Sequence, residues 1–416
     1  MPRGLSDELV IVSTSSDDAF AIDLAFALGQ REDIADLISL KTFANGEFCP
    51  RFISDVVDGR STSAPGHQLD GARVLIVSTA GSQLTRQDMA MRNLLVARAA
   101  KENGALEVVL VEPDLFYSAQ DRGARPELGA TDTPRDEDDV RKFDGQPFSA
   151  GLYVELLELA GVSRVVTVHN HSEVVEALYR EKFGRRFHNI VPTALYADYL
   201  QASNIVDFAD DGTRLALCAP DAGAREFVAS IADELNLPNL RFVTLDKKRT
   251  GERDVSVCMH PKSAASLEDI AGYDVVLMDD MVRTGSTVIQ AAEFLRQANP
   301  RRVVFAVTHF YASEDGRQKM AHSALDEILT TNTIPTVLNR DVQGRLRRKM
   351  TVLKIERWLA RHLEAMLELP PAPDADDGLY QIDMSSKNPR FTRRIWSNAE
   401  LPDLARERSA RARDDL

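Results

Sequence analysis

Cysteine is scarce in this chain, with three residues among 416. Cys49, Cys218 and Cys258 lie far apart, and no two of them form a CxxC pair. An odd number of widely spaced cysteines argues against a disulfide framework and against a zinc cluster. We therefore expect a protein of a reducing compartment, and the expected location is the cytoplasm.

Long apolar runs and long basic runs are also missing. The first residues lack the apolar core of a signal peptide, and no run approaches the roughly 20 residues of a membrane span, so no membrane partner is expected. The 64 acidic and 50 basic residues give a net charge of −14. Because duplex binding rests on Lys and Arg neutralising phosphates, no nucleic-acid partner is expected, and an anionic substrate would need a local basic site.

What the chain does have is a repeated alternation of apolar β-type runs and helical segments. At about 150 residues per domain, its length predicts two or more domains. An alternation of this kind predicts an α/β fold with a doubly wound, parallel sheet formed twice. The predicted buried strands are 9–12, 73–79, 107–111, 164–168, 215–218, 241–245, 275–278 and 302–308, and the main predicted helices are 17–28, 87–101, 147–159, 225–235 and 288–297.

The stretch 274–287, DVVLMDDMVRTGST, carries the most distinctive pattern. An apolar run ends in Asp279 and Asp280, and Thr284 to Thr287 then opens a helical segment. Backbone N–H groups and hydroxyls of such a loop can hold a phosphate, and the two carboxylates can bind sugar hydroxyls or magnesium. Spacing alone leaves this interpretation open beside a plain strand–turn–helix, in which the acid caps the helix and the glycine only makes the turn.

Polar residues follow three other predicted strands. His169 and His171 flank one residue at a strand end, where they could bind metal or simply pack or cap. Asp221 follows the strand 215–218. The segment 246–251, DKKRTG, is the densest basic cluster near these strand ends, and we interpret it as neutralising phosphate charge rather than as a solvated loop.

Three connecting segments have compositions of their own. Asn45-Gly46 is a strong turn signal and predicts a hairpin. The segment 123–146 is rich in Pro, Asp and Glu and poor in apolar residues, so we predict a mobile loop. The tail beyond Pro370 has no assigned role, although three aromatic residues could anchor it: Tyr380, Phe391 and Trp396.

Taken in order from Leu9 to Leu369, these segments resemble ribose-phosphate diphosphokinases, the synthetases of phosphoribosyl diphosphate. The resemblance implies two tandem phosphoribosyltransferase-type domains, 1–188 on the ATP side and 189–340 with the ribose 5-phosphate loop, each a mainly parallel sheet flanked by helices. The strand and helix of 341–369 are expected to pack back on the first domain, and 370–416 is left as a tail. The implied activity is magnesium-dependent transfer of the diphosphoryl group of ATP to the 1-hydroxyl of ribose 5-phosphate.

The resemblance also implies roles for residues of the second domain. Asp279 and Asp280 would hold the ribose hydroxyls. Lys247 and Arg249 match a basic pair on a flexible catalytic loop, and Asp221 matches a metal-linked Asp in the segment PDAGA. The residues expected to surround the 5-phosphate are Arg283, Thr284, Gly285, Ser286 and Thr287.

In the first domain, His171 matches a magnesium-associated His. Two segments match ATP contacts. The first is an adenine loop that in the family reaches ATP in a neighbouring subunit, which implies a homo-oligomer, and the second follows the strand 107–111. The matching residues are Phe43, Asn45, Gly46 and Glu47 in the first segment and Gln120, Asp121 and Arg122 in the second.

Four positions depart from the family pattern. Ala119 stands in place of an ATP-contacting Arg, whose planar five-donor fork it cannot imitate. Asn45 replaces an Asp and can still accept through its amide oxygen. His169 stands where an Asp is usual, and Arg283 stands at an often acidic position.

Two other functions remain open at this point. The changes at positions 45, 119 and 283 would suit a non-catalytic partner that binds and regulates a catalytic synthetase. The loop 279–287 is shared with phosphoribosyltransferases that consume phosphoribosyl diphosphate. The retained Lys247 and Arg249 favour the synthetase.

Overall fold

The computed structural model describes residues 9–53, 56–57, 60–61, 63–81, 84–131, 134–209, 211–249, 255–372, 379–385 and 392–395. The chain divides into two compact units, Met1–Val191 with Met366–Asp374, and Pro192–Ala365 with Ala375–Leu416. Within the described ranges, no helix is both long and apolar enough to cross a membrane.

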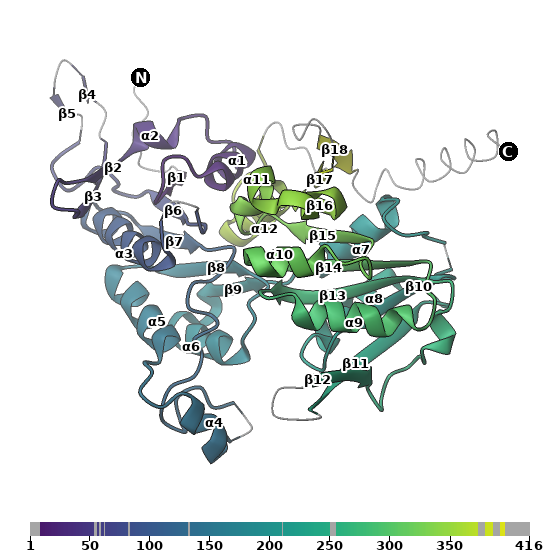
Figure 1. Ribbon diagram of the computed structural model, residues 1–416. Coiled ribbons are helices and arrows are strands. Elements are labelled where there is room, and N and C mark those ends of the chain that lie inside the picture. Colours follow the sequence, from purple (N-terminus) through teal and green to yellow (C-terminus); the bar gives the residue numbers. More distant parts are fainter. Residues whose placement is uncertain are drawn as a thin grey trace, which may run out of the picture. The chain divides into compact units, whose positions relative to one another are not determined.

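The first unit is built on a five-stranded sheet in which all strands run parallel (Figure 1). In four of these strands every residue after the first is buried, as expected for strands covered on both faces. In sheet order the strands are β1 (Leu9–Ser13), β6 (Arg73–Val77), β7 (Glu107–Val111), β8 (Arg164–Val168) and β9 (Phe187–Ile190).

Helices connect these strands in sequence. Since each strand lies beside its successor, right-handed crossovers place α3, α5 and α6 on one face of the sheet, where α5 contacts both others. The hairpin of β2 and β3 contacts α3, and β4 and β5 form a second, small hairpin. The bounds are α1 (Ala19–Ala27), α2 (Ile34–Leu37), β2 (Ile38–Thr42), β3 (Phe48–Phe52), β4 (Val56–Val57), β5 (Arg60–Ser61), α3 (Arg86–Glu102), α4 (Glu137–Lys142), α5 (Ser149–Ala160) and α6 (Glu173–Phe183).

The second unit contains a nine-stranded sheet, parallel in its centre and antiparallel at both ends. In sheet order the strands are β12 (Val255–Met259), β11 (Arg241–Arg249), β10 (Leu215–Ala219), β13 (Asp274–Val282), β14 (Arg302–Phe310), β15 (Glu327–Thr331), β16 (Met350–Lys354), β17 (Leu379–Asp383) and β18 (Thr392–Ile395).

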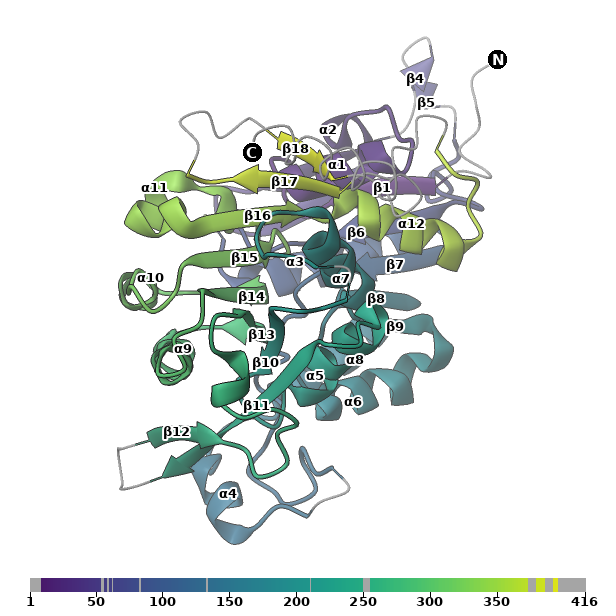
Figure 2. The ribbon, with the colours of Figure 1, turned by 90° about the vertical axis from the view of Figure 1, so that its right-hand side faces the viewer.

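The direction of winding in this sheet reverses between β10 and β13. From β10 the chain passes through α8 to β11 on one side, and it then returns to β13 on the other side of β10. Accordingly α8 lies on one face of the sheet with α7, and α9 and α10 lie on the opposite face (Figure 2). The bounds are α7 (Thr193–Ala202), α8 (Arg225–Leu235), α9 (Ser286–Arg296), α10 (Glu314–Met320), α11 (Arg340–Gln343) and α12 (Glu356–Leu367).

Ligands of open α/β sheets bind at the carboxyl ends of strands beside such a reversal. The predicted residues Asp221, Asp279 and Asp280 follow β10 or lie in the outer part of β13. The carboxyl ends of β10 and β13 are therefore the candidate ligand site of the second sheet.

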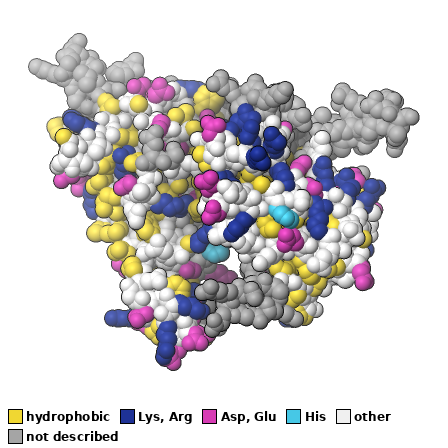
Figure 3. Space-filling view, in the orientation of Figure 1, with side chains coloured by type: hydrophobic (Ala, Val, Ile, Leu, Met, Phe, Trp, Pro, Cys, Tyr) yellow, Lys and Arg dark blue, Asp and Glu magenta, His cyan; other side chains and the backbone are white. Residues whose placement is uncertain are grey.

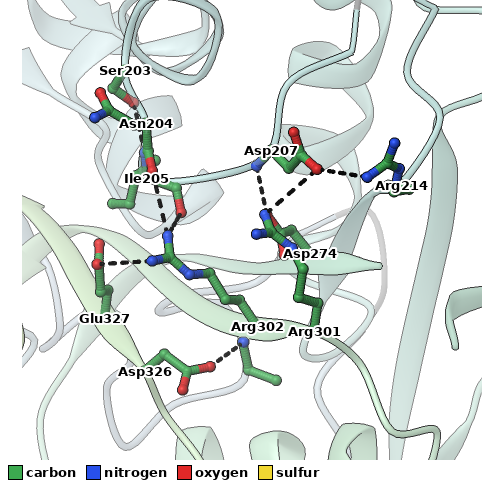
Figure 4. A network of polar contacts seen from close by, with 11 residues as sticks. Ser203, Asn204, Ile205, Asp207, Arg214, Asp274, Arg301, Arg302, Asp326 and Glu327 are labelled. Atoms are coloured by element: carbon green, nitrogen blue, oxygen red, sulfur yellow. Dashed lines mark hydrogen bonds and ion pairs between the residues drawn. The ribbon is translucent and has the colours of Figure 1, made fainter. Parts of the chain in front are cut away.

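Ion pairs hold the second sheet at the opposite ends of its strands, where β13 begins (Figure 4). Asp274 is fully buried at the start of β13, and both its oxygens bind the Arg301 guanidinium, with Nε at 2.7 Å from Oδ1. The Asp207 backbone N–H also donates to Asp274, and Arg214 pairs with the Asp207 carboxylate at 3.0 Å. A buried carboxylate requires such partners, so this network fixes the segment before β10 to the sheet.

Two expectations about the C-terminal segments change. The segment 341–369 was expected to pack on the first domain, but β16 pairs with β15 in the second sheet, because its Met350 and Val352 side chains lie in the core of the second unit. Only the end of α12 is grouped with the first unit, where Leu367 O accepts from Arg73 Nη1 at 2.6 Å.

The tail also contributes to the second sheet. β17 pairs with β16, and Tyr199 donates its hydroxyl to Gln381 Oε1 at 2.6 Å. The ring of Tyr380 lies 4.3 Å from the Arg357 guanidinium. Phe391 and Trp396 lie outside the described residues.

Candidate functional site

Three carboxylates lie at the carboxyl ends of the neighbouring strands β10 and β13, where the winding of the second sheet reverses. Asp221 follows β10 and accepts from the backbone N–H groups of Gly223 and Ala224 at 3.1 and 3.3 Å. Burial, and then the charges of Asp280 and Asp221, raise the pKa of Asp279 well above its usual range. Like charges held this close favour a bound cation or a hydroxyl donor.

The strand that carries Asp279 is longer than the sequence predicted. We expected it to end at Met278, but β13 continues to Val282, with Asp279 opposite Val307 and Met281 opposite His309 of β14. The apolar run alone could not reveal this extension, because the last residues are held by pairing with a neighbouring strand. The two carboxylates therefore stand on a paired strand rather than on a loose turn.

Helix α9 begins directly after this strand, at a glycine in the left-handed region. Gly285 has φ +71° and precedes Ser286 at the helix start, and no side chain caps the first turn. The first N–H groups of a helix have no partner within the helix, and they carry its positive dipole end. The exposed Arg283 and Thr284 lead into this turn. An uncapped, glycine-led helix start of this kind can hold a phosphate.

Helix α10 supports this turn by close backbone packing. A Cβ atom at Gly285 would lie 2.7 Å from Met320 Cγ, and one at Gly316 would lie 2.9 Å from Arg283 O. The Lys319 ammonium donates to Ser286 Oγ at 3.1 Å. Lys319 was not predicted from the sequence, because it lies far from 279–287 along the chain and only the packing of α10 on α9 brings it here.

Lys247 and Arg249 lie on a two-stranded ribbon. We expected a strand ending at Leu245 and then a flexible loop, but β11 continues to Arg249, where Lys247 is opposite Val257 and Arg249 opposite Val255 of β12. The predicted strand end at Leu245 is wrong because the returning strand β12 supplies backbone partners. Thr250 and Gly251 lie outside the described residues. In the sheet, β11 lies directly beside β10.

In the first unit, the structure brings Asp121 beside the histidine segment. The Ser172 hydroxyl donates to Asp121 Oδ2 at 2.6 Å, and the same hydroxyl caps α6. His169 is buried with φ +49°, and His171, two residues further on, is exposed. The loops after β7 and β8 are therefore tied together, as expected for carboxyl ends of neighbouring parallel strands.

A buried carboxyl group shapes the turn that leads to Gln120. Glu112 is fully buried, and its Oε1 accepts from Asn93 Nδ2 and from the Tyr153 hydroxyl, both at 2.5 Å. Its Oε2 accepts from the Phe116 backbone N–H at 3.0 Å. Burial raises the pKa of Glu112 to about 7. The sequence signal was weak, because a glutamate after an apolar run is usually exposed.

The segment 123–146, predicted to be a mobile loop, contains helix α4 and a set of hydrogen bonds over its described residues. Arg135 has a side chain only 4% exposed, and its Nη1 donates to the carbonyl oxygens of Gly123, Leu128 and Arg125 at 2.7, 2.7 and 3.1 Å. Its Nε pairs with Asp139 on α4 at 2.7 Å. One buried guanidinium thus replaces the apolar core that this composition lacks.

The hairpin predicted from Asn45-Gly46 is confirmed, with β2 antiparallel to β3. Asn45 Oδ1 accepts from Glu47 N at 3.2 Å, and Gly46 has φ +88°. The tip is exposed, and the Phe43 side chain is 44% exposed with Lys41 over its ring. Among the described residues we find no hydrogen bond from Phe43–Glu47 to the segment Gln120–Arg122.

The donor atoms present suit a hard divalent cation. Asp221, Asp279 and Asp280 offer carboxylate oxygens, which magnesium prefers. Over the described part of the chain, no group of three or more His, Cys, Asp or Glu side chains is arranged to hold a metal ion by itself.

Comparison with known protein families places residues 199–341 in the phosphoribosyl transferase domain family. A ribose-phosphate pyrophosphokinase of Pyrococcus furiosus is 30% identical over 248 residues, which cover 59% of this chain and 74% of that protein. The ribose-phosphate pyrophosphokinase of Corynebacterium efficiens is 27% identical over 331 residues, or 80% of this chain and 85% of that protein.

A solved structure has the same fold. The phosphoribosylpyrophosphate synthetase of Mycobacterium smegmatis superposes with a TM-score of 0.64 at 23% identity, covering 88% of this chain and all of that one. The predicted fold class, with mainly parallel sheets flanked by helices in two phosphoribosyltransferase-type domains, is confirmed.

Proposed function

Because this chain belongs to the ribose-phosphate pyrophosphokinase family, we propose that it transfers the diphosphoryl group of ATP to the 1-hydroxyl of ribose 5-phosphate, giving phosphoribosyl diphosphate and AMP. The observation that carries the proposal is the uncapped start of α9, which follows the strand of Asp279 and Asp280 after the turn 283–285, at the reversal of the second sheet.

Ribose 5-phosphate has an anionic end and a hydroxyl-bearing ring, and the two halves of this site match them. The N–H groups and side chains from Arg283 to Thr287 bind the 5-phosphate, and Asp279 and Asp280 accept from the ribose hydroxyls. Lys319 adds a positive charge beside Ser286. Burial raises the pKa of Asp279, and hydroxyl donors that bind its ionised form stabilise that form and so oppose the rise.

The donor nucleotide is bound by residues of the first unit. Gln120, Asp121 and Arg122 contact ATP, with Asp121 held by Ser172. Phe43, Asn45, Gly46 and Glu47 form an adenine-binding tip. An exposed tip suits a contact with a neighbouring copy, so the enzyme is a homo-oligomer that shares this site between subunits.

Hydrophobic side chains gather over the area of α3 and α5 in Figure 3, and Met91, Leu152 and Leu159 on these helices are more than half exposed.

In the reaction, the ribose 1-hydroxyl attacks the β-phosphorus of ATP. A bond forms between the ribose 1-oxygen and the β-phosphorus, while the bond from the β-phosphorus to the α,β-bridging oxygen breaks. AMP leaves with the bridging oxygen, and the proton of the 1-hydroxyl passes to solvent. No protein nucleophile is required. Lys247 and Arg249 stabilise negative charge on the group in transfer, which is the main task of an enzyme in such a reaction.

Asp221 in one unit and His171 in the other would each contact magnesium, as separate contacts. A magnesium ion bound to the triphosphate would neutralise phosphate charge. Asp221 is kept in position by the Gly223 and Ala224 N–H groups, which hold its carboxylate at the strand end.

The test is AMP formation by the purified protein with ATP, ribose 5-phosphate, magnesium and inorganic phosphate. Lys247→Ala is expected to lower kcat by at least about a hundredfold, as removal of one charge-stabilising group does. Lys248→Ala, on the neighbouring residue of the same strand, is the control and is expected to keep kcat. An inactive wild type, together with a Lys247→Ala variant that behaves identically, would contradict the proposal and favour a regulatory partner. Diphosphate release that depends on an added base would instead identify a phosphoribosyltransferase.

A further inference from the structure

The segment 123–146 is built onto the residues that the proposed function assigns to ATP. Gly129 has φ +90°, and a Cβ atom there would lie 2.3 Å from Asp121 O and 2.9 Å from Arg122 Cα. Gly123 N donates to Leu128 O at 3.1 Å, which closes the intervening turn. The segment therefore folds back directly on the backbone at 121–122.

Arg122 is held by this segment through an ion pair. Its Nη1 lies 2.7 Å from Asp139 Oδ1, and its guanidinium lies 5.9 Å from the Phe143 ring centroid. The Arg122 side chain is 44% exposed, whereas that of Asp139 is 17% exposed. An arginine has five N–H donors, so one bond to Asp139 leaves others for a ligand.

Asp139 is also held in place by contacts other than its ion pair with Arg122. Its Oδ2 accepts from Arg135 Nε at 2.7 Å, and its backbone N–H donates to Asp136 Oδ1 at the start of α4. The hydrogen bond from Arg135, and then the charges of both arginines, lower the pKa of Asp139, so it is ionised at neutral pH. Each oxygen of one carboxylate therefore holds a different arginine, one nearly buried and one partly exposed.

We propose that the segment 123–146 is a positioning element for the donor nucleotide, in which Asp139 holds the Arg122 guanidinium in the orientation that binds ATP. This inference rests on the proposed function. A partly exposed arginine has many rotamers, and ordering it on binding weakens affinity. Asp139 orders Arg122 before the ligand arrives. Asp139 is a positioning residue, since it acts through Arg122 and does not touch the substrate.

The test compares Asp139→Asn with Asp138→Asn. Asp138 is the exposed preceding residue on α4, so the two variants change the net charge equally. Asp139→Asn is expected to raise the KM for ATP, and the Kd for a non-hydrolysable ATP analogue measured by calorimetry, about fivefold. The KM for ribose 5-phosphate and kcat are expected to stay within about twofold, and Asp138→Asn is expected to match the wild type.

A double-mutant cycle separates positioning from structural support. In an Arg122→Ala background, Asp139→Asn is expected to have no further effect on the ATP constants, because the side chain through which it acts is gone. Asp139→Glu keeps the charge for Arg135 but moves it by one methylene, and it is expected to weaken ATP binding less. If Asp139→Asn fails to fold, the cycle is run with Asp139→Glu instead.

Three outcomes would overturn the inference. They are an unchanged or lowered ATP constant in Asp139→Asn, an equal rise in Asp138→Asn, and a rise that persists in the Arg122→Ala background. A wild type that binds the ATP analogue but forms no AMP would contradict the proposed function and leave the inference about Asp139 testable. The Kd values for the analogue in the double-mutant cycle would still decide the role of Asp139.

Discussion

Glu112 is a buried carboxyl group whose replacement by glutamine is expected to change how stability depends on pH. It receives hydrogen bonds from Asn93, Tyr153 and the Phe116 backbone, yet burial raises its pKa from 4.5 to about 7. In the unfolded chain the group returns to its ordinary pKa. Between about pH 4.5 and 7 the folded protein therefore keeps a proton that the unfolded chain has lost.

The sign of the effect follows from this difference in bound protons. Because the unfolded state binds fewer protons in this range, the free energy of unfolding falls as pH rises and levels off above about pH 7. A pKa raised from 4.5 to about 7 corresponds to roughly 3 kcal/mol lost over the range. Glutamine resembles the protonated acid, does not titrate, and removes this loss.

The assay is urea unfolding of wild type and Glu112→Gln at pH 5, 6, 7 and 8, followed by circular dichroism. Subtracting the two proteins at each pH cancels the titration of every other group. The variant is expected to gain between about 2 and 3 kcal/mol relative to wild type between pH 5 and 8, because part of the loss already occurs below pH 5, and its altered hydrogen bonds add only a constant difference. A difference that does not change with pH would refute the reasoning, since it would mean that Glu112 titrates alike in both states.

Three further substitutions test other parts of the account. Gly285→Ala places a side chain at a positive φ and against α10, so the KM for ribose 5-phosphate is expected to rise at least about tenfold. The control is Gly272→Ala, where φ is +76° but no atom lies within 4 Å of the added Cβ, and it is expected to leave this KM unchanged in the same assay. Asp274→Ala removes the buried partner of an arginine and is expected to lower the free energy of urea unfolding by about 3 kcal/mol, against less than about 1 kcal/mol for Asp207→Ala, whose ion pairs are partly exposed. Lys319→Ala is expected to raise the KM for ribose 5-phosphate about fivefold, with no change in the KM for ATP; a rise in both would assign the residue to folding rather than to phosphate binding.

The sequence predicted those parts of the fold that depend on local pattern. Apolar runs located the inner strands because buried parallel strands need apolar residues on both faces. Asn45-Gly46 located the hairpin because its turn requires a residue that adopts positive φ. Asp221 and Asp279, each placed at the end of a predicted strand, are close enough for their charges to interact.

What the sequence could not predict depends on partners distant along the chain. The outer part of β11 exists because β12 returns beside it, and β16 joins the second sheet because its apolar face fits that core. Arg135 looked like one more charge in a polar segment, yet it is buried because three carbonyl oxygens converge on it. Composition reports how much apolar surface a segment can bury, but not whether one guanidinium can organise its backbone.

The most direct test of the central claim is identification of the products. Wild-type protein is incubated with ATP, ribose 5-phosphate and magnesium, and the mixture is followed by phosphorus-31 NMR. The account predicts equal amounts of AMP and of a ribose 5-phosphate that carries a diphosphate on its 1-oxygen, with neither formed when ribose 5-phosphate is omitted. Formation of ADP in place of AMP, or AMP formation without the sugar phosphate, would contradict it.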